Sequence, residues 1–127
     1  MSGLSETIVI VDDDDGVRNS LHTFFEVSGY SVYSFENAEE YLQSELLTPS
    51  CLVIDLELHG LNGVAAMEIL QEQNRFGPTI VITGTYRNDL MLAAEKSAAL
   101  AVIAKPVDPQ ILEAKITEIV MQTEIAM

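Results

Sequence analysis

Apolar residues recur along the chain in two alternating patterns. Continuous apolar runs rich in β-branched residues predict strands at 7–11, 51–54 and 79–82. Runs of this kind are typical of parallel strands covered on both faces, so we expect these three inside a sheet. The run 31–35 mixes serine with apolar residues, which favours an edge strand, and 100–104 forms a fifth short run.

Between these runs, apolar positions recur with the period of a helix. Helix-start residues precede most of these segments: Asp14 or Asp15, Asn37, Asn88 or Asp89, and Asp108 with Pro109, while a further helix is expected around 66–73. Five repeats of strand then helix predict an α/β domain with one doubly wound, five-stranded parallel sheet. The edge-like second strand and the three apolar strands fit the strand order 2-1-3-4-5.

Composition limits the classes of function. A chain of 127 residues with 48% hydrophobic content fits one folded domain. Its net charge of -14, from 20 acidic and 6 basic residues, opposes binding to nucleic acid or to a membrane surface and favours a divalent cation. The single cysteine, Cys51, excludes an intrachain disulfide and is expected in the core. No apolar run is long enough to span a membrane, and no basic region precedes the first one, so we expect a cytoplasmic protein.

Polar side chains follow four of the predicted strands, where parallel sheets bind ligands. Asp12 and Asp13 follow the first strand, Asp55 the third, Thr83 the fourth and Lys105 the fifth. Taken singly, each fits a helix cap, a turn or a solvated surface position, and the spacing of 12–15 excludes an EF-hand loop. Taken together, the carboxylates could hold Mg²⁺, while the ammonium and the hydroxyl could stabilise a phosphoryl group on an aspartate.

The ordered set of motifs resembles a response-regulator receiver domain of two-component signalling, with the flavodoxin-like fold and five helices. The motifs are Asp12-Asp13 with Arg18, Asp55, Gly60-Leu61-Asn62-Gly63, Thr83-Gly84 and Lys105-Pro106. The resemblance covers essentially all of residues 1–127, with a core of about 6–122, and is nearest to the receivers of transcriptional regulators.

The resemblance implies a regulatory switch rather than an enzyme. Asp55 would accept a phosphoryl group from a histidine kinase or a histidine phosphotransfer protein. The metal ligands for Mg²⁺ would be Asp12, Asp13, Asp55 and the backbone carbonyl of Glu57. Thr83 and Lys105 would contact the phosphate, with Gly84 and Pro106 beside them. The face made by the fourth helix, fifth strand and fifth helix would then change its affinity for an output domain, a partner protein or a second copy of the chain.

Three positions depart from the family pattern. Val102 occupies the place of the usual Phe or Tyr, so no ring there can couple Thr83 to the surface, and Tyr86 is a candidate substitute. His59 replaces a common proline, and Ala98 replaces a common glycine. We expect these changes to affect the output more than the phosphorylation, and we interpret His59 as a solvated loop residue.

Two other functions remain open from the sequence. A receiver-like binding module could work without phosphate, with its equilibrium locked by Val102 and Ala98. A phosphatase of the haloacid dehalogenase type is suggested by the motif at residues 13–17, DDDGV, although the chain is short for that fold and no acidic pair follows Lys105. The sequence identifies neither the kinase nor the output, and it does not tell whether the chain is a stand-alone regulator or part of a longer protein.

Overall fold

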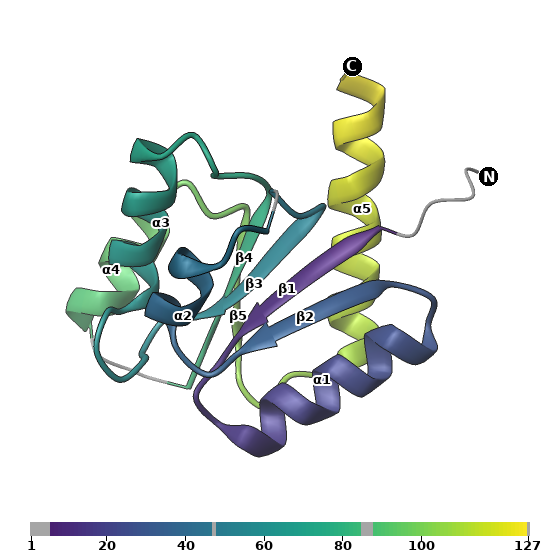
Figure 1. The fold of residues 1–127 in the computed structure, drawn as a ribbon, viewed down its shortest axis with the longest axis horizontal. Coiled ribbons are helices and arrows are strands. Elements are labelled where there is room, and N and C mark those ends of the chain that lie inside the picture. Colours follow the sequence, from purple (N-terminus) through teal and green to yellow (C-terminus); the bar gives the residue numbers. More distant parts are fainter. Residues whose placement is uncertain (1–5, 47, 85–87, 127) are drawn as a thin grey trace.

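The computed structural model describes residues 6–46, 48–84 and 88–126. Strands and helices alternate throughout the chain (Figure 1). In chain order the elements are β1 (Thr7–Val11), α1 (Asp15–Val27), β2 (Ser31–Phe35), α2 (Ala38–Gln43), β3 (Cys51–Asp55), α3 (Gly63–Glu72), β4 (Thr79–Thr83), α4 (Asn88–Lys96), β5 (Ala101–Ala104) and α5 (Pro109–Ala126).

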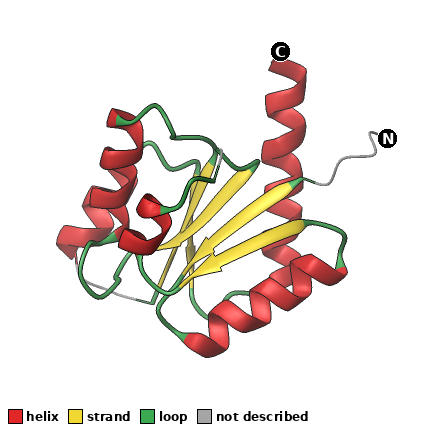
Figure 2. Cartoon of the chain, in the orientation of Figure 1, coloured by secondary structure: helices red, strands yellow, loops and turns green. Residues whose placement is uncertain are grey.

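The strands form one five-stranded parallel sheet with the order β2-β1-β3-β4-β5, which confirms the predicted fold class. All strand arrows point toward the same edge of the sheet, so the carboxyl ends of the strands lie together (Figure 2). β3 and β4 each extend one residue beyond the predicted runs. Asp55 and Thr83 are therefore the last residues of strands, where Asp55 pairs with Ile82 and Thr83 pairs with Ala104.

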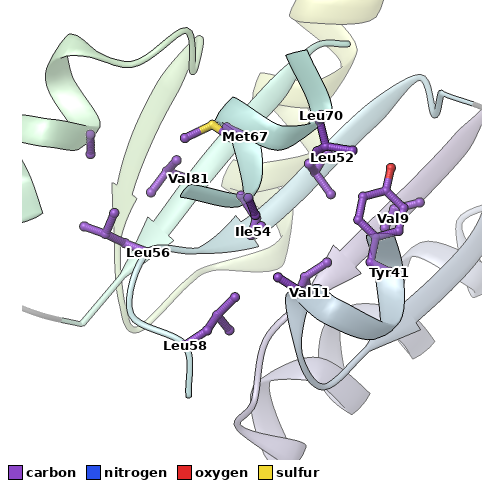
Figure 3. Close-up of a cluster of buried hydrophobic side chains, with 13 residues drawn as sticks. Val9, Val11, Tyr41, Leu52, Ile54, Leu56, Leu58, Met67, Leu70 and Val81 are labelled. Carbon is purple, nitrogen blue, oxygen red and sulfur yellow. The ribbon is translucent and has the colours of Figure 1, made fainter. Parts of the chain in front are cut away.

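Alternate residues of each strand point to opposite faces of the sheet and fill two separate cores. On one face, Val9, Ile54 and Val81 pack with residues of α2, α3 and α4, including Tyr41 and Met67 (Figure 3). On the other face, residues of the same strands pack against α1 and α5: Ile8, Ile10, Cys51, Val53, Ile80 and Ile82 meet Leu21, Phe25, Leu112, Ile116 and Ile119. The central strands are therefore buried on both sides, as their unbroken apolar runs predicted.

Side chains cap the helices that begin near the carboxyl edge of the sheet. Asp14 accepts a hydrogen bond from Val17 N–H at 3.0 Å, and Asn37 accepts one from Glu40 N–H at 2.8 Å, so both predicted caps are confirmed. Asn62 caps α3 in the same way, which the sequence analysis had not singled out. The following residue, Gly63, lies so close to β3 that a Cβ atom there would be 2.6 Å from the carbonyl oxygen of Asp55. A glycine at this position lets α3 begin directly against the end of β3.

Among the described residues, no helix is both long enough and apolar enough to cross a lipid bilayer. Tyr86, the predicted substitute for the missing aromatic residue, lies outside the described residues.

Candidate functional site

Three aspartates from two adjacent strands meet at the carboxyl edge of the sheet. Asp12 and Asp13 follow β1, and Asp55 ends β3, which pairs with β1. Each of the three offers a carboxylate oxygen, and these oxygens all lie within 4.8 Å of one another. The parallel register of β1 and β3 therefore brings together carboxylates that are more than forty residues apart in the chain.

Asp12 is completely buried, and its carboxylate is only partly satisfied. Its Oδ1 accepts a hydrogen bond from the backbone N–H of Asp14 at 2.9 Å. Its Oδ2 is buried and accepts no hydrogen bond of good geometry within the described part of the chain, but it forms an ion pair with Lys105, whose Nζ lies 3.0 Å away. The three carboxylates carry more negative charge than the single Lys105 ammonium balances, so the cluster points to a cation-binding function.

Lys105 supplies a positive charge within the cluster. Its Nζ lies 2.8 Å from Asp55 Oδ2, to which it donates a hydrogen bond, and 3.0 Å from Asp12 Oδ2. Burial would lower the pKa of this ammonium, but its close contacts with the negative charges of Asp55 and Asp12 outweigh burial and raise the pKa above its ordinary value. The lysine therefore stays charged and partly neutralises two buried carboxylates.

The carboxyl group of Asp55 holds its proton more tightly than an ordinary aspartate. Burial raises its pKa to about 6, and the nearby charge of Asp12 acts in the same direction. Hydrogen bonds from Lys105 and from the backbone N–H of Glu57, the latter at 3.0 Å, oppose this shift. At neutral pH Asp55 is still mainly ionised, so it remains available as a nucleophile.

Thr83 and Gly84 lie beside this cluster at the end of β4. Thr83 is 3% exposed, and its carbonyl oxygen accepts a hydrogen bond from Lys105 N–H at 2.8 Å, which joins the ends of β4 and β5. Gly84 is exposed, and a Cβ atom built on it would lie 3.6 Å from Lys105 Cδ. Pro106 follows Lys105 through a cis peptide bond and is exposed. Of the predicted site residues, Val102 lies apart: it is half-buried and packs against the core shared with α4.

Two contacts of the site were not predicted from the sequence. Arg18 donates a hydrogen bond from Nη1 to the carbonyl oxygen of Asp12 at 2.8 Å, which holds the start of α1 to the end of β1. His59 contacts Asp13: its ring Nδ1 lies 2.8 Å from Asp13 Oδ2, and its backbone N–H donates to the same oxygen at 3.2 Å. The interpretation of His59 as a purely solvated residue was therefore incomplete. Its ring is exposed, but it also meets a site residue 46 positions away, and no local pattern could indicate a contact at that separation.

The donor set fits a hard divalent cation. All three carboxylates supply oxygen, their charge exceeds that of the one ammonium beside them, and no histidine or cysteine belongs to the trio. Oxygen ligands and an incomplete protein shell are typical of magnesium sites that also bind phosphate groups. The cluster could therefore hold a metal ion next to Asp55, with the Lys105 ammonium also beside that carboxylate.

Comparison with known proteins agrees with this geometry. Residues 8–117 match the family model described as the response regulator receiver domain. The chain is 36% identical over 109 residues to nodulation protein W of Bradyrhizobium diazoefficiens, which covers 84% of this chain and 48% of that protein. It is 29% identical over 120 residues to the transcriptional regulatory protein FixJ of the same organism, covering 94% of this chain and 58% of FixJ. The chain thus spans about half the length of these curated relatives.

Solved structures show the same fold. A CheY-like response regulator receiver domain protein from Methanospirillum hungatei aligns with a TM-score of 0.87 and 27% identity, covering 98% of this chain and all of that one. The structure of FixJ-N aligns with a TM-score of 0.76 and 27% identity, covering 94% of this chain and 95% of that one.

Proposed function

The chain belongs to the response regulator receiver domain family of two-component signalling, and from this membership we propose that it is a phosphorylation switch whose acceptor is Asp55. The observation that supports this role best is the setting of Asp55. Its carboxylate ends a central strand, lies among two further carboxylates, and contacts the Lys105 ammonium at 2.8 Å.

In the proposed reaction, a carboxylate oxygen of Asp55 attacks the phosphorus of a phosphohistidine on a histidine kinase or a histidine phosphotransfer protein. A new O–P bond forms, the P–N bond breaks, and the histidine ring takes up a proton as it leaves. Asp12, Asp13, Asp55 and the backbone carbonyl of Glu57 would hold Mg²⁺, which when bound would neutralise charge on the phosphoryl oxygens.

Two protein groups would stabilise the phosphorylated state. Lys105 already lies at the acceptor carboxylate, so its ammonium could move from Asp55 to a phosphoryl oxygen without leaving the site. The hydroxyl of Thr83, at the end of β4, would donate a hydrogen bond to another oxygen, and Gly84 would leave room for it. The chain itself would catalyse only this transfer and the later hydrolysis of the aspartyl phosphate, which releases inorganic phosphate and frees Asp55, so we assign it a regulatory rather than an enzymatic role.

The output would involve the face formed by α4, β5 and α5. Large apolar side chains are exposed on these elements or directly beside them: Leu92 of α4 is 53% exposed, Ile111 of α5 is 63% exposed, and Leu100, just before β5, is 57% exposed. Exposed apolar residues on neighbouring elements are suited to contact an output domain, a partner protein or a second copy of the chain. We propose that residues 6–122 form the receiver core, that it works in the cytoplasm, and that its charge of -14 keeps this domain itself from binding nucleic acid.

Phosphorylation can be tested with acetyl phosphate and Mg²⁺, followed by intact-protein mass spectrometry. We expect one added phosphate on the wild type and none on Asp55→Asn. Asp15→Asn is the matched control, because Asp15 belongs to the same run of aspartates but its side chain is 77% exposed and lies outside the carboxylate trio. Equal labelling of wild type and Asp55→Asn would rule out Asp55 as the acceptor.

A phosphate-independent binding module is the second candidate, and the position of Val102 favours it. Val102 is packed into the core beside α4 and carries no ring that could move when Thr83 engages a phosphate. If this candidate holds, a partner will bind phosphorylated wild type and Asp55→Asn with equal affinity. The haloacid dehalogenase alternative is set aside because the chain belongs to the receiver family.

A further inference from the structure

The side chain of Asp13 is held by the loop that follows β3. His59 approaches Asp13 Oδ2 with two groups, its ring Nδ1 at 2.8 Å and its backbone N–H at 3.2 Å. A carboxylate can only accept hydrogen bonds, so an attractive contact between Nδ1 and this oxygen requires the hydrogen on Nδ1. Both donors converge on one oxygen, which restricts the rotation of the Asp13 carboxylate.

The loop itself is tied down on both sides of His59. Before it, the backbone N–H of Glu57 donates to Asp55 Oδ1 at 3.0 Å. After it, the backbone N–H of Leu61 donates to Glu39 Oε2 at 3.1 Å. Between them, Gly60 has a φ of +80°, and a Cβ there would lie 2.6 Å from Glu39 Oε2. His59 is therefore presented to Asp13 from a loop anchored to both β3 and α2.

The ring lies at the rim of an open hollow between the loop and α2. The hollow has a volume of about 590 Å³ and is lined by Asp13, Glu36, Asn37, Glu39, His59 and Gly60. The imidazole is 96% exposed, whereas the Asp13 side chain is only 23% exposed. Solvent screens a contact between such an exposed ring and Asp13, so the ion pair itself contributes little free energy. The ring would act on the site by restricting the orientation of the Asp13 carboxylate.

We propose that His59 is a positioning residue for the metal site, which orients the Asp13 carboxylate through the Nδ1–H donor. This inference rests on the proposed function, because it assumes that Asp13 binds Mg²⁺. Hydrogen bonds from neighbouring groups to ligating carboxylates restrict their orientation before the metal binds, and losing such a partner commonly weakens metal affinity by about 10–100-fold. Because the ring is exposed and the backbone donor remains after its removal, we expect an effect below that range.

Competition between His59 and the cation would have the opposite effect. The ring contacts an oxygen that a metal ion could use, so His59 could compete with the cation, and its removal would then tighten binding. The geometry favours positioning, because the ring nitrogen and the backbone N–H of His59 both meet Oδ2 of Asp13 and leave its Oδ1 without a contact to His59. The measured direction of the change decides between the two effects.

The test is the Mg²⁺ affinity of the folded chain, measured by titrating MgCl₂ and following backbone amide signals by NMR at one fixed pH. We expect His59→Ala to weaken binding about 3–10-fold. His59→Asn is the conservative rescue, because its amide nitrogen can occupy nearly the place of Nδ1, and we expect it to bind within about twofold of wild type. His22→Ala is the matched control: His22 is the other histidine of the chain, and its ring contacts Ser34 and Glu26 rather than the acidic site.

The outcomes separate this inference from the proposed function. If wild type binds no Mg²⁺, the metal site of the proposed function fails. If wild type binds but His59→Ala binds equally well or more tightly, the positioning role is overturned and the metal site stands. Equal weakening of His59→Ala and His59→Asn would also overturn it, because the donor hydrogen would then not be the cause.

Discussion

Burial makes the ionised carboxylate of Asp55 a destabilising group in the folded, metal-free protein. The pKa of Asp55 is about 6 in the fold, above its ordinary value of 3.8, so folding favours the protonated form. Protonated Asp55 therefore adds to the free energy of unfolding. This contribution is fully present below the pKa of Asp55 in the unfolded chain, and it is lost as the pH rises through about 6. At neutral pH the chain therefore keeps an ionised group that its folded structure opposes, as active sites often do.

This cost leads to a prediction for Asp55→Asn. In metal-free buffer at pH 7, we expect the amide to raise the free energy of unfolding by about 1–3 kcal/mol, because a shift of one pKa unit corresponds to about 1.4 kcal/mol. In this variant Lys105 keeps an ion pair, because its Nζ also lies 3.0 Å from Asp12 Oδ2. The difference from wild type should shrink toward pH 4, where wild-type Asp55 is protonated.

The measurement is urea unfolding with EDTA at several pH values between 4 and 7.5. Asp15→Asn serves as the control, because its exposed side chain should change stability by no more than about 0.5 kcal/mol. A stability difference between Asp55→Asn and wild type that does not change with pH would contradict the cause assigned here.

At the scale of secondary-structure elements, one arginine holds the short helix α2 in place. Arg75, in the loop between α3 and β4, donates from Nη1 to the carbonyl oxygen of Leu42 at 2.8 Å and from Nη2 to those of Tyr41 and Ser44 at 3.4 Å. Its guanidinium also lies 5.5 Å from the centre of the Tyr41 ring. The last carbonyl groups of any helix lack partners within the helix, and six residues provide little stability by themselves.

We therefore expect Arg75→Ala to destabilise the protein by about 2 kcal/mol and to expose the α2 amides to faster hydrogen exchange. Arg75→Lys should lose part of this stability, because an ammonium lacks the planar fork that reaches several carbonyls. The control is Lys115→Ala: Lys115 pairs with Glu118 at 3.7 Å on an exposed surface, so its loss should cost less than about 0.5 kcal/mol. Equal destabilisation by Arg75→Ala and Lys115→Ala would show that the hydrogen bonds of Arg75 do not stabilise α2.

At the scale of the whole molecule, the sheet packs between two layers of helices. The reactivity of Cys51 can measure how well these layers exclude solvent from the central strands. Cys51 begins the central strand β3 and is completely buried in the core that faces α1 and α5. Burial raises the pKa of its thiol to about 12, so almost no reactive thiolate is present at neutral pH.

We predict that Cys51 reacts with an aromatic disulfide reagent at least about 1,000-fold more slowly in the native protein than in urea, because the thiol is reached only through unfolding. Stopped-flow absorbance would measure both rates. If Cys51 in the native protein reacted almost as fast as in urea, β3 would have to open locally. The two helical layers would then exclude solvent less well than the structure indicates.

The elements and the fold class could be predicted from the sequence because they depend on local patterns. Unbroken apolar runs indicate strands buried on both faces, and the 3.6-residue period indicates helices. Residue type alone predicted Asn37 as one helix cap and either Asp14 or Asp15 as another, and the structure shows that the second is Asp14. The site residues could be nominated because ligands bind at the carboxyl ends of parallel strands, so Asp12, Asp55 and Lys105 had a common place to meet.

Only the tertiary structure decided which charges touch. The ion pair of Asp12 with Lys105, the raised pKa of Asp55 and the hydrogen bonds of Arg75 depend on ångström-scale packing between elements far apart in the chain. The contact of His59 with Asp13 is of the same kind, because it depends on how the loop after β3 folds back over the end of β1. Hydrophobic period is a local property of the chain, whereas burial and electrostatic contacts belong to the assembled fold, and this difference separates what the sequence determined from what the structure added.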